Sequence, residues 1–175
     1  DKDLSLLNEF LAPIPLEVGS NGQSTVYSGD LTSAGSVVTK RGTGTLTLRG
    51  VNSTGGNLVV AQGVVRMDGG SLNAASVSTV NAGGGQFVLD GGVLTATANS
   101  VFAGGTNGLL VNGGEAAFDG GLSSENGSAT NHIIKVTGGS VTASSVTLGR
   151  SSLIYTAEPT GGSTTSGLHI ANGSV

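Results

Sequence analysis

Met67-Asp68-Gly69-Gly70-Ser71-Leu72 is the stretch that decides the fold, because it returns along the chain in register. Its copies begin at Leu89, Val111, Val136 and, more weakly, Ile170; they read Leu-Asp-Gly-Gly-Val-Leu, Val-Asn-Gly-Gly-Glu-Ala, Val-Thr-Gly-Gly-Ser-Val and Ile-Ala-Asn-Gly-Ser-Val. The starting residues are 22, 22, 25 and 34 positions apart (67 to 89, 89 to 111, 111 to 136, 136 to 170). Self-similarity at this period predicts a solenoid, in which each coil buries its apolar face against its neighbours.

Three short runs of alternating apolar and polar residues in each repeat predict three β-strands per coil. In the second copy they are residues 87–89 before the Gly-Gly pair, 94–96 after it and 100–102 some six residues later. Each strand pairs with its counterpart in the next coil, about 4.8 Å along the axis. We therefore expect an all-β chain forming one parallel β-helix of roughly six to seven coils. One interior ladder should contain Met67, Leu89, Val111, Val136 and Ile170.

The composition fits a narrow solenoid core better than a compact globule. Of 175 residues, 3% are aromatic and 10% are charged, so Val, Leu, Ala and Ile must fill the core while Ser, Thr, Asn and Gly cover the surface. The 32 glycines accompany 3 prolines and regular strand patterns, which indicates turns rather than disorder. The absence of Cys excludes disulfides and Cys-ligated metals.

Charge argues against one class of partner, and hydropathy argues against a membrane-spanning segment. The formal net charge of −4 argues against nucleic acid, which needs clustered Lys and Arg. No apolar run reaches the roughly 18–20 residues that span a bilayer, so no membrane insertion of this segment is expected. Three Asn-x-Ser/Thr sequons, at Asn52, Asn126 and Asn172, are explained by chance in a chain rich in these residues.

Residues 1–17 differ from the rest, which we treat as one β-helix over 18–175. They contain no Gly, and Asp3 can cap a short helix that Pro13 and Pro15 would end. Its apolar stripe would consist of Leu4, Leu7, Phe10 and Leu11. We expect a helical or irregular cap that covers the first coil, because an open solenoid end exposes apolar core and unpaired strand edges.

The spacing divides the later chain into coils at 67–88, 89–110, 111–135 and 136–169. The two longer coils carry extra residues near 123–131 and 155–167, which must leave the helix as loops. Residues 151–167, with Tyr155 and Pro159, are expected as an exposed loop. Specific recognition is expected at such insertions.

The stretch Lys40-Arg41-Gly42-Thr43-Gly44-Thr45-Leu46-Thr47-Leu48-Arg49-Gly50-Val51-Asn52, continued by Thr54-Gly55-Gly56 and Gly63-Val64-Val65, resembles the autotransporter-associated β-strand repeat. The agreement covers residues 40–65, and Ser53-Thr54 departs from the pattern where an aromatic residue often stands. The resemblance implies a right-handed β-helix (β-solenoid) in a secreted or surface-displayed bacterial protein, exported by a type V or related route. It implies no catalytic residues.

Asp68 and Asp90 are the best candidates for chemistry, because they occupy the same repeat position in successive coils. Stacked about 5 Å apart, they could share a cation or raise each other's pKa, as a polysaccharide-acting enzyme would require. The alternative is turn chemistry, since Asp and Asn commonly precede Gly-Gly and the position reads Asp, Asp, Asn, Thr and Ala along the repeats. We favour the turn.

Other polar groups give weaker signals. Glu115, Asp119 and Glu125 form an acidic cluster beside an insertion, but a carbohydrate site would also need aromatic residues and the chain has no Trp. His132 and His169 share no repeat position, so a metal site is not expected. A basic area is expected opposite the acidic corner, made of Lys40, Arg41, Arg49 and Arg66.

These patterns predict a non-enzymatic structural or adhesive β-helix with no catalytic residue, cofactor or metal, and the resemblance implies a location outside the bacterial outer membrane. A glycan or a host surface protein is the expected partner. Because the sequence stops at Val175 just after a corner, we also expect either a segment of a longer passenger or a subunit that stacks end to end into a fibre. The alternative is a polysaccharide lyase or hydrolase that uses Asp68 and Asp90.

Overall fold

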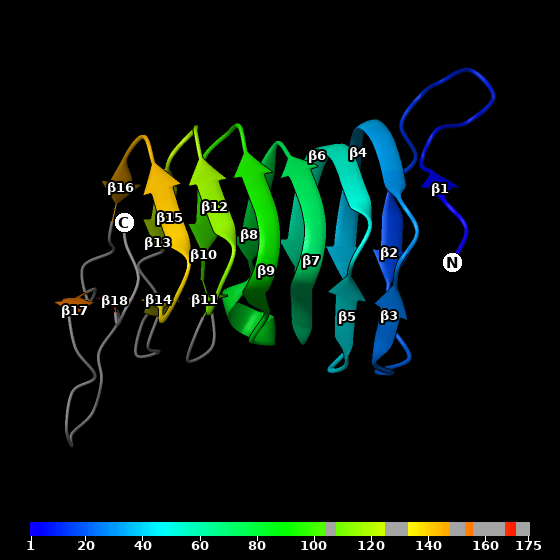
Figure 1. Cartoon of the computed structure of the whole chain (residues 1–175). Helices are drawn as coiled ribbons and strands as arrows, with labels where there is room; N and C mark the ends of the chain where they lie inside the picture. The colour runs from blue at the N-terminus through cyan, green and yellow to red at the C-terminus, as the bar shows by residue number, and fades with distance from the viewer. Residues whose placement is uncertain (104–107, 125–132, 148–152, 156–166, 171–175) are drawn as a thin grey trace.

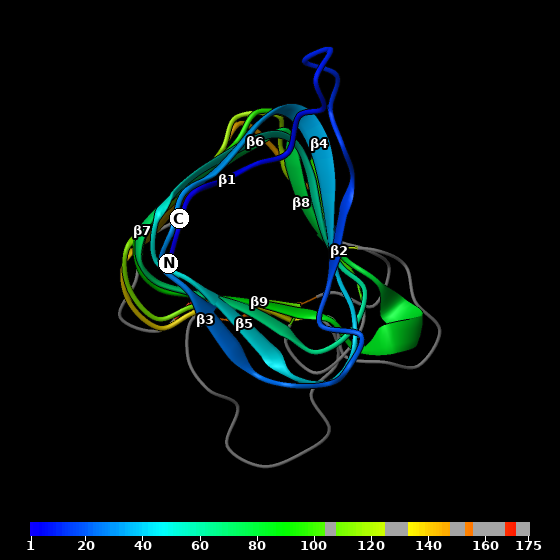
Figure 2. The same cartoon turned by 90° about the vertical axis from the view of Figure 1, so that its right-hand side faces the viewer.

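The computed structural model describes residues 1–103, 108–124, 133–147, 153–155 and 167–170. The chain winds into a rod with a triangular cross-section (Figures 1 and 2). Seen from the N-terminal end in Figure 2, it runs clockwise while receding from the viewer, so the coil is right-handed. The rod makes about five turns, and the pairs Val65↔Phe87 and Phe87↔Leu109 are both 22 residues apart. The expected right-handed parallel β-helix is confirmed.

Three faces, called A, B and C in chain order, make up each coil. Face A contains β3 (Thr25–Tyr27), β5 (Thr45–Leu48), the first parts of β7 (Val64–Ala74) and β9 (Gln86–Ala96), β11 (Leu109–Val111), β14 (Ile133–Val136), β18 (Gly167–Ile170) and β17 (Leu153–Tyr155). Face B contains β1 (Leu4–Ser5), the first parts of β4 (Leu31–Lys40) and β6 (Val51–Val60), the last parts of β7 and β9, β12 (Glu115–Phe118) and β15 (Ser140–Ala143). Face C contains β2 (Leu16–Val18), the last parts of β4 and β6, β8 (Ser76–Thr79), β10 (Ser100–Phe102), β13 (Leu122–Ser124) and β16 (Val146–Thr147). A short 3-10 turn, η1 (Asn81–Gly83), lies between faces C and A.

The predicted interior ladder is confirmed. Parallel pairing joins Met67 to Leu89, Leu89 to Val111, Val111 to Val136 and Val136 to Ile170. The first four side chains are fully buried. The alternation of side chains along each strand therefore places apolar residues of successive coils in one column of the core. Burial of each large side chain in this column stabilises the fold by about 1.5–3 kcal/mol.

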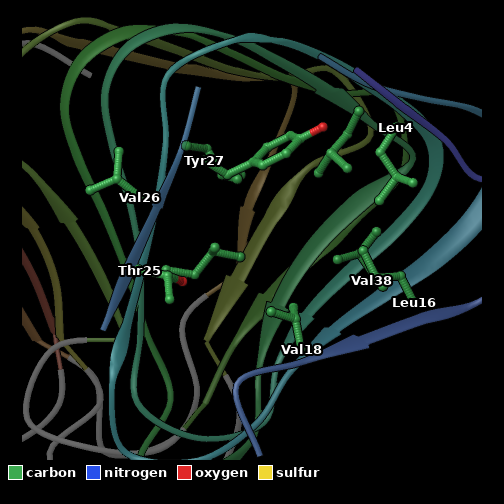
Figure 3. A pocket seen from close by; sticks show the side chains of 10 residues that line it. Leu4, Leu16, Val18, Thr25, Val26, Tyr27 and Val38 are labelled. Carbon is green, nitrogen blue, oxygen red and sulfur yellow. The ribbon is translucent and has the colours of Figure 1, made fainter. Parts of the chain in front are cut away.

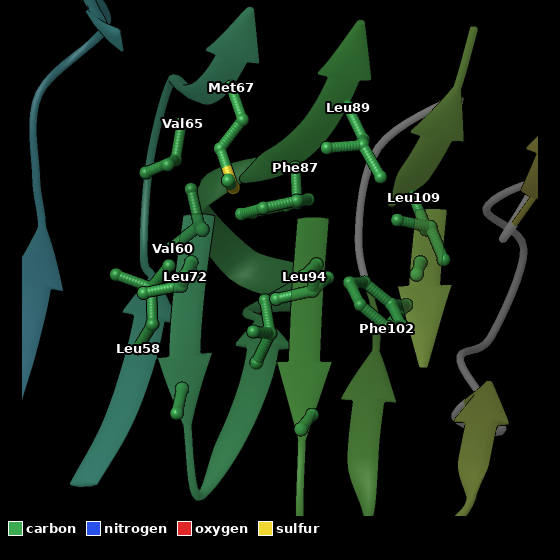
Figure 4. Packing of buried hydrophobic residues seen from close by; sticks show 14 of the residues in the cluster. Leu58, Val60, Val65, Met67, Leu72, Phe87, Leu89, Leu94, Phe102 and Leu109 are labelled. Carbon is green, nitrogen blue, oxygen red and sulfur yellow. The ribbon is translucent and has the colours of Figure 1, made fainter. Parts of the chain in front are cut away.

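The core is a column of stacked apolar side chains from all three faces, shown around Phe87 in Figure 4. Face A supplies a second ladder that runs through Val65, Phe87 and Leu109. Between faces B and C, the rings of Phe102 and Phe118 meet edge to face, 5.9 Å apart. Aromatic residues are few in this chain, and these three phenylalanines are all buried.

On face C, side-chain hydroxyls connect β8 to β10. The backbone N–H of Val77 donates to Ser100 Oγ (3.0 Å), and that of Ala103 donates to Thr79 Oγ1 (2.7 Å). Both hydroxyl groups are buried. In the described part of the chain, β10, β13 and β16 accordingly form a three-stranded sheet apart from the continuous one.

The predicted N-terminal helix is wrong. Leu4 and Ser5 form β1, which pairs with Leu31 and Thr32, and the Asp3 carboxylate accepts from the backbone N–H of Asp30 (2.9 Å) rather than capping a helix. A helix this short cannot offset its nucleation cost alone, whereas the edge of β4 offers ready hydrogen bonds. β1 lies along the wall of the coil in Figure 2, so it does not cover the end as expected.

The predicted insertions are only partly tested. Ser123 belongs to β13, so the extra residues near 123–131 begin later than expected, and 125–131 lie outside the described residues. Tyr155 belongs to β17, which pairs with β18, so 153–155 are not a loop. Pro159 and its neighbours lie outside the described residues. The rod makes about five turns instead of the expected six to seven.

In the corners at Gly69-Gly70 and Gly91-Gly92, the second glycine is the one that the fold requires. Gly70 has a φ of +68°, and a Cβ there would lie 2.1 Å from the Arg49 carbonyl oxygen of the preceding coil. Gly92 repeats this situation, with a φ of +88° and 2.4 Å to the Gly70 oxygen. Gly69, by contrast, has open space around its Cβ position. Close stacking of coils at the corner therefore excludes any side chain at the second position.

Gly70→Ala should lower the free energy of unfolding by about 2 kcal/mol or more, because it combines left-handed strain with a backbone clash. The matched variant Gly69→Ala should change it by less than about 0.5 kcal/mol. Urea denaturation followed by circular dichroism measures both. Equal effects of the two substitutions would contradict the assigned corner geometry.

Candidate functional site

The corner between faces A and B carries a column of polar residues, which we call the corner column: Asp68, Asp90, Asn112 and Thr137. Each follows a buried residue at the end of a face A strand and precedes a Gly-Gly pair. The parallel register of β7, β9, β11 and β14 brings these four residues to the same corner of successive coils. The corner column includes both aspartates singled out from the sequence.

Each aspartate of the corner column is paired with its own arginine. Arg49 Nε and Nη2 donate to Asp68 Oδ1 and Oδ2 at 2.9 and 2.7 Å, which is a bidentate pair. Arg66 Nε lies 2.5 Å from Asp90 Oδ2. Arg49 directly follows β5, and Arg66 lies in the face A part of β7, so each arginine comes from one coil earlier and links neighbouring coils at the corner.

A chain of hydrogen bonds extends the corner column beyond the arginines. Asn112 Nδ2 donates to Asp90 Oδ1 (2.7 Å), and Thr137 Oγ1 donates to Asn112 Oδ1 (2.7 Å). Asp90 thus accepts from a guanidinium on one side and an amide on the other. The drift from Asp to Asn to Thr along the repeats supplies donors and acceptors in an order that satisfies each neighbour.

The pKa of Asp68 is shifted in the direction opposite to the one that the catalytic alternative requires. Its hydrogen bonds to Arg49 are the main cause that holds the pKa of Asp68 below its usual value. The expectation of a mutually raised pKa is therefore wrong for Asp68, because opposite charge lies closer to it than like charge. A shared cation is also disfavoured, since guanidinium groups already occupy the approach to both carboxylates.

The pH dependence of stability should report the Arg49–Asp68 pair. A depressed folded-state pKa stabilises the fold above the unfolded-state value of about 3.9, and this contribution disappears as pH falls through the folded-state pKa. Asp68→Asn should therefore lower stability at neutral pH and approach wild type in acid. Urea denaturation at a series of pH values tests this. The control is Asp119→Asn, because Asp119 is exposed and makes no ion pair within the described structure. If Asp68→Asn lowered the free energy of unfolding by the same amount at every pH, the assignment would be contradicted.

Asn112→Asp should be more destabilising at neutral pH than Asn112→Ala. The alanine variant loses a hydrogen bond, whereas the aspartate variant places a second carboxylate against Asp90. Two like charges about 4 Å apart in water repel by about 1 kcal/mol. The excess should disappear below pH 4, where carboxyl groups protonate. Thermal denaturation at neutral and acid pH measures it, and an excess that persists in acid would refute the contact.

The expected basic area does not exist as a free surface. Lys40 is buried, Arg49 and Arg66 bind the corner column, and Arg41 Nε lies 2.7 Å from Glu17 Oε2. Opposite charges at the ends of adjacent strands attract, so these arginines face the acids rather than lie opposite them. Sequence spacing did not show this, because each arginine and its aspartate are 19 or 24 residues apart.

The other candidate groups are not brought together. Glu115 begins β12 and Asp119 follows its end, so about 13 Å of extended strand separates them. Glu125 and His132 lie outside the described residues, and only the backbone of His169 is described, in β18. Within the described part of the chain, no three His, Cys, Asp or Glu side chains are placed to hold a metal ion.

Two polar residues whose burial the sequence analysis did not predict hold corners from inside the coil. Lys40 Nζ donates to the carbonyl oxygens of Arg41 (2.6 Å), Gly42 (2.8 Å) and Gln62 (3.3 Å), and burial lowers the pKa of Lys40. Asn52 Nδ2 donates to the Gly50 and Ser71 oxygens at 2.9 and 3.2 Å. Both residues stand at positions of their strands that alternate with outward-facing ones and point inward, and this alternation could have indicated their burial from the sequence. Asn52 is 1% exposed, so this sequon is not an accessible glycosylation site in the folded chain.

At the N-terminal end, an apolar pocket of about 240 Å³ lies between the first strands (Figure 3). Leu16 and Val18 line it from β2, and Val26 and Tyr27 line it from β3. β2 and β3 each have a sheet neighbour on one side only. The pocket is thus the apolar interior of the first coil rather than a cleft that converges on polar groups.

No helix in the described part of the chain has the length and apolar character needed to cross a bilayer. Comparison of the chain with models of protein families, with curated proteins and with solved structures finds no match. The class defined by the fold is a parallel β-solenoid, and its corner column is a structural ladder of ion pairs and hydrogen bonds.

Proposed function

We propose that this chain is a rod-like structural or adhesive module of a secreted or surface-displayed bacterial protein. The resemblance of residues 40–65 to the autotransporter-associated β-strand repeat supports this location. The fold is compatible with it, because a rod built from stacked coils places its surface at a distance from an anchor and repeats it along its length. A glycan or a host surface protein is the proposed partner.

The pairing of the corner column is the observation that most favours a non-enzymatic role. Asp68 and Asp90 are engaged by Arg49 and Arg66, and Asp90 also accepts from Asn112. A general acid needs a raised pKa and a general base needs a free lone pair near substrate. Carboxylates occupied by guanidinium and amide donors are instead suited to linking coils.

The free edges at the N-terminal end favour stacking of a further coil. Strands β1, β2 and β3 each pair on one side, and apolar side chains line the pocket between them. Unpaired edges of this kind accept another strand in register. A neighbouring coil of a longer passenger and a second copy stacked end to end would both satisfy them.

A polysaccharide-acting enzyme remains the second candidate, because β-solenoid grooves can place carboxylates along one face and Asp68 and Asp90 lie at one corner. It would require both arginines to release their partners when substrate binds. The two ion pairs are partly exposed, so such release is not costly in itself.

Incubation of the chain with a panel of neutral and uronate-containing polysaccharides tests the two functions. We expect no new reducing ends and no unsaturated uronate absorbance, with or without Asp68→Asn and Asp90→Asn. Binding without cleavage on a glycan or host-protein array would support the adhesive role. Cleavage by the wild-type chain that both variants abolish would overturn the proposal.

A further inference from the structure

A lateral arm, residues 7–15, leaves the rod between β1 on face B and β2 on face C (Figure 2). At the same corner of the next two coils, β4 and β6 continue from face B to face C without interruption. The arm is therefore an addition to the solenoid pattern. It projects sideways from the N-terminal part of the rod, as Figure 1 also shows.

The tip of the arm exposes large apolar side chains. Phe10 is 81% exposed, Leu11 75% and Ile14 42%. Phe87, Phe102 and Phe118, in contrast, are fully buried. Elsewhere in the described chain the exposed large hydrophobic residues are valines and Leu4. In a protein with so few aromatic residues, one phenylalanine held in water at a turn is an unusual use of that side chain.

Asn8 organises the tip through hydrogen bonds. Its Oδ1 accepts from the backbone N–H groups of Phe10 and Ala12 (both 2.9 Å), and its carbonyl accepts from Leu11 (2.9 Å). The Asn8 N–H donates to the Ala12 carbonyl (2.9 Å). The turn is thus fixed by its own contacts, without a partner.

The base of the arm is anchored to the second coil. Leu6 is buried, its N–H donates to the Thr32 carbonyl (2.8 Å), and its carbonyl accepts from Ser36 Oγ and from the Ile14 N–H (both 2.9 Å). Leu11 has a φ of +60°, a left-handed conformation that is costly for a branched residue. Such a conformation persists only where surrounding contacts impose it, and it marks segments that serve binding.

The hydrogen-bond pattern suits burial in an apolar medium. From residue 10 to residue 15 every backbone N–H donates within the protein, and the two prolines have none. In a bilayer a backbone donor without a partner costs several kcal/mol, so a segment with satisfied donors can enter its apolar part.

The negative charge of the chain and the small apolar area of the tip limit which surface the arm can bind. Glu9 adjoins the tip and the net charge is −4, so an anionic surface would repel the arm. A fully exposed aromatic side chain offers roughly 150–250 Å², so three tip residues fall short of the roughly 800 Å² per partner that a stable dimer buries. A zwitterionic lipid surface meets both limits.

We propose that the arm is a peripheral membrane-docking element that inserts Phe10, Leu11 and Ile14 into the interfacial region of a zwitterionic bilayer. The arm does not span the bilayer, and the rod beside it stays in water. Docking of this kind is shallow. The proposal goes beyond the structural role above and does not depend on the source of the membrane.

The chain has no Trp, so Phe10→Trp introduces a single tryptophan, at the tip, whose fluorescence can be excited selectively. On titration with phosphatidylcholine vesicles we expect its emission to shift to the blue and the protein to co-sediment with lipid, and both effects should persist at high salt. Phosphatidylglycerol vesicles should bind less. No shift and no co-sedimentation would overturn the proposal, as would stronger binding to the anionic vesicles.

Matched variants identify the source of binding. Phe10→Ser with Leu11→Ser should weaken co-sedimentation at least about tenfold, whereas Val51→Ser, at a 60% exposed position on face B, should leave it unchanged. Asn8→Ala should weaken it while the apolar tip stays intact. Equal loss in the Val51 variant would refute the assignment. A blue shift that depends on protein concentration without lipid would mean self-association and would also overturn it.

Discussion

Closing the corners is the constraint on which the rest of this rod depends. At each corner the chain turns from one face to the next within a few residues, and carbonyl groups of successive coils come close together. Those oxygens need donors, and the atoms beside them need space. Gly70 supplies space by having no Cβ, whereas Lys40 and Asn52 supply donors from inside the coil. Strand pairing along the faces then follows from coils held at one spacing.

The buried Lys40 shows how strong this constraint is. Its ammonium group lies among three carbonyl oxygens within 3.3 Å, and no carboxylate in the described part of the chain forms an ion pair with it. Burial of a charge is costly unless it is hydrogen-bonded, and unsatisfied carbonyls are costly as well. Placing one against the other lowers both costs. Asn52 does the same at the next corner with a neutral amide, which avoids the cost of a buried charge.

At the surface, the corner column also joins successive coils through polar contacts. Arg49, Arg66, Asp68 and Asp90 link one coil to the next outside the core. Asn112 continues the series in the next coil, where Val88 is aligned with Arg66. Exposed pairs contribute little to stability individually. In a solenoid, however, they repeat along one edge and favour one register between coils. Irregular segments such as the arm at residues 7–15 are where the chain departs from this repetition and presents other chemistry.

The sequence by itself determined the period, the strand parity and the glycine corners. It placed Met67, Leu89, Val111 and Val136 in one ladder, since these depend on spacing along the chain and on the alternation of strands. Residues 1–17 precede the repeats and lack this pattern, so their sequence predicted a helix. In the structure, Leu4 and Ser5 instead pair with the edge of β4.

Only the tertiary structure decided which polar groups meet. Arg66 and Asp90 are 24 residues apart, and their contact exists because one coil brings them to the same corner. The partners of Lys40 and Asn52 likewise include carbonyl groups of a neighbouring coil, which strand parity alone does not specify. Periodicity fixes positions along a repeat, whereas the partners of a side chain depend on the distances between repeats.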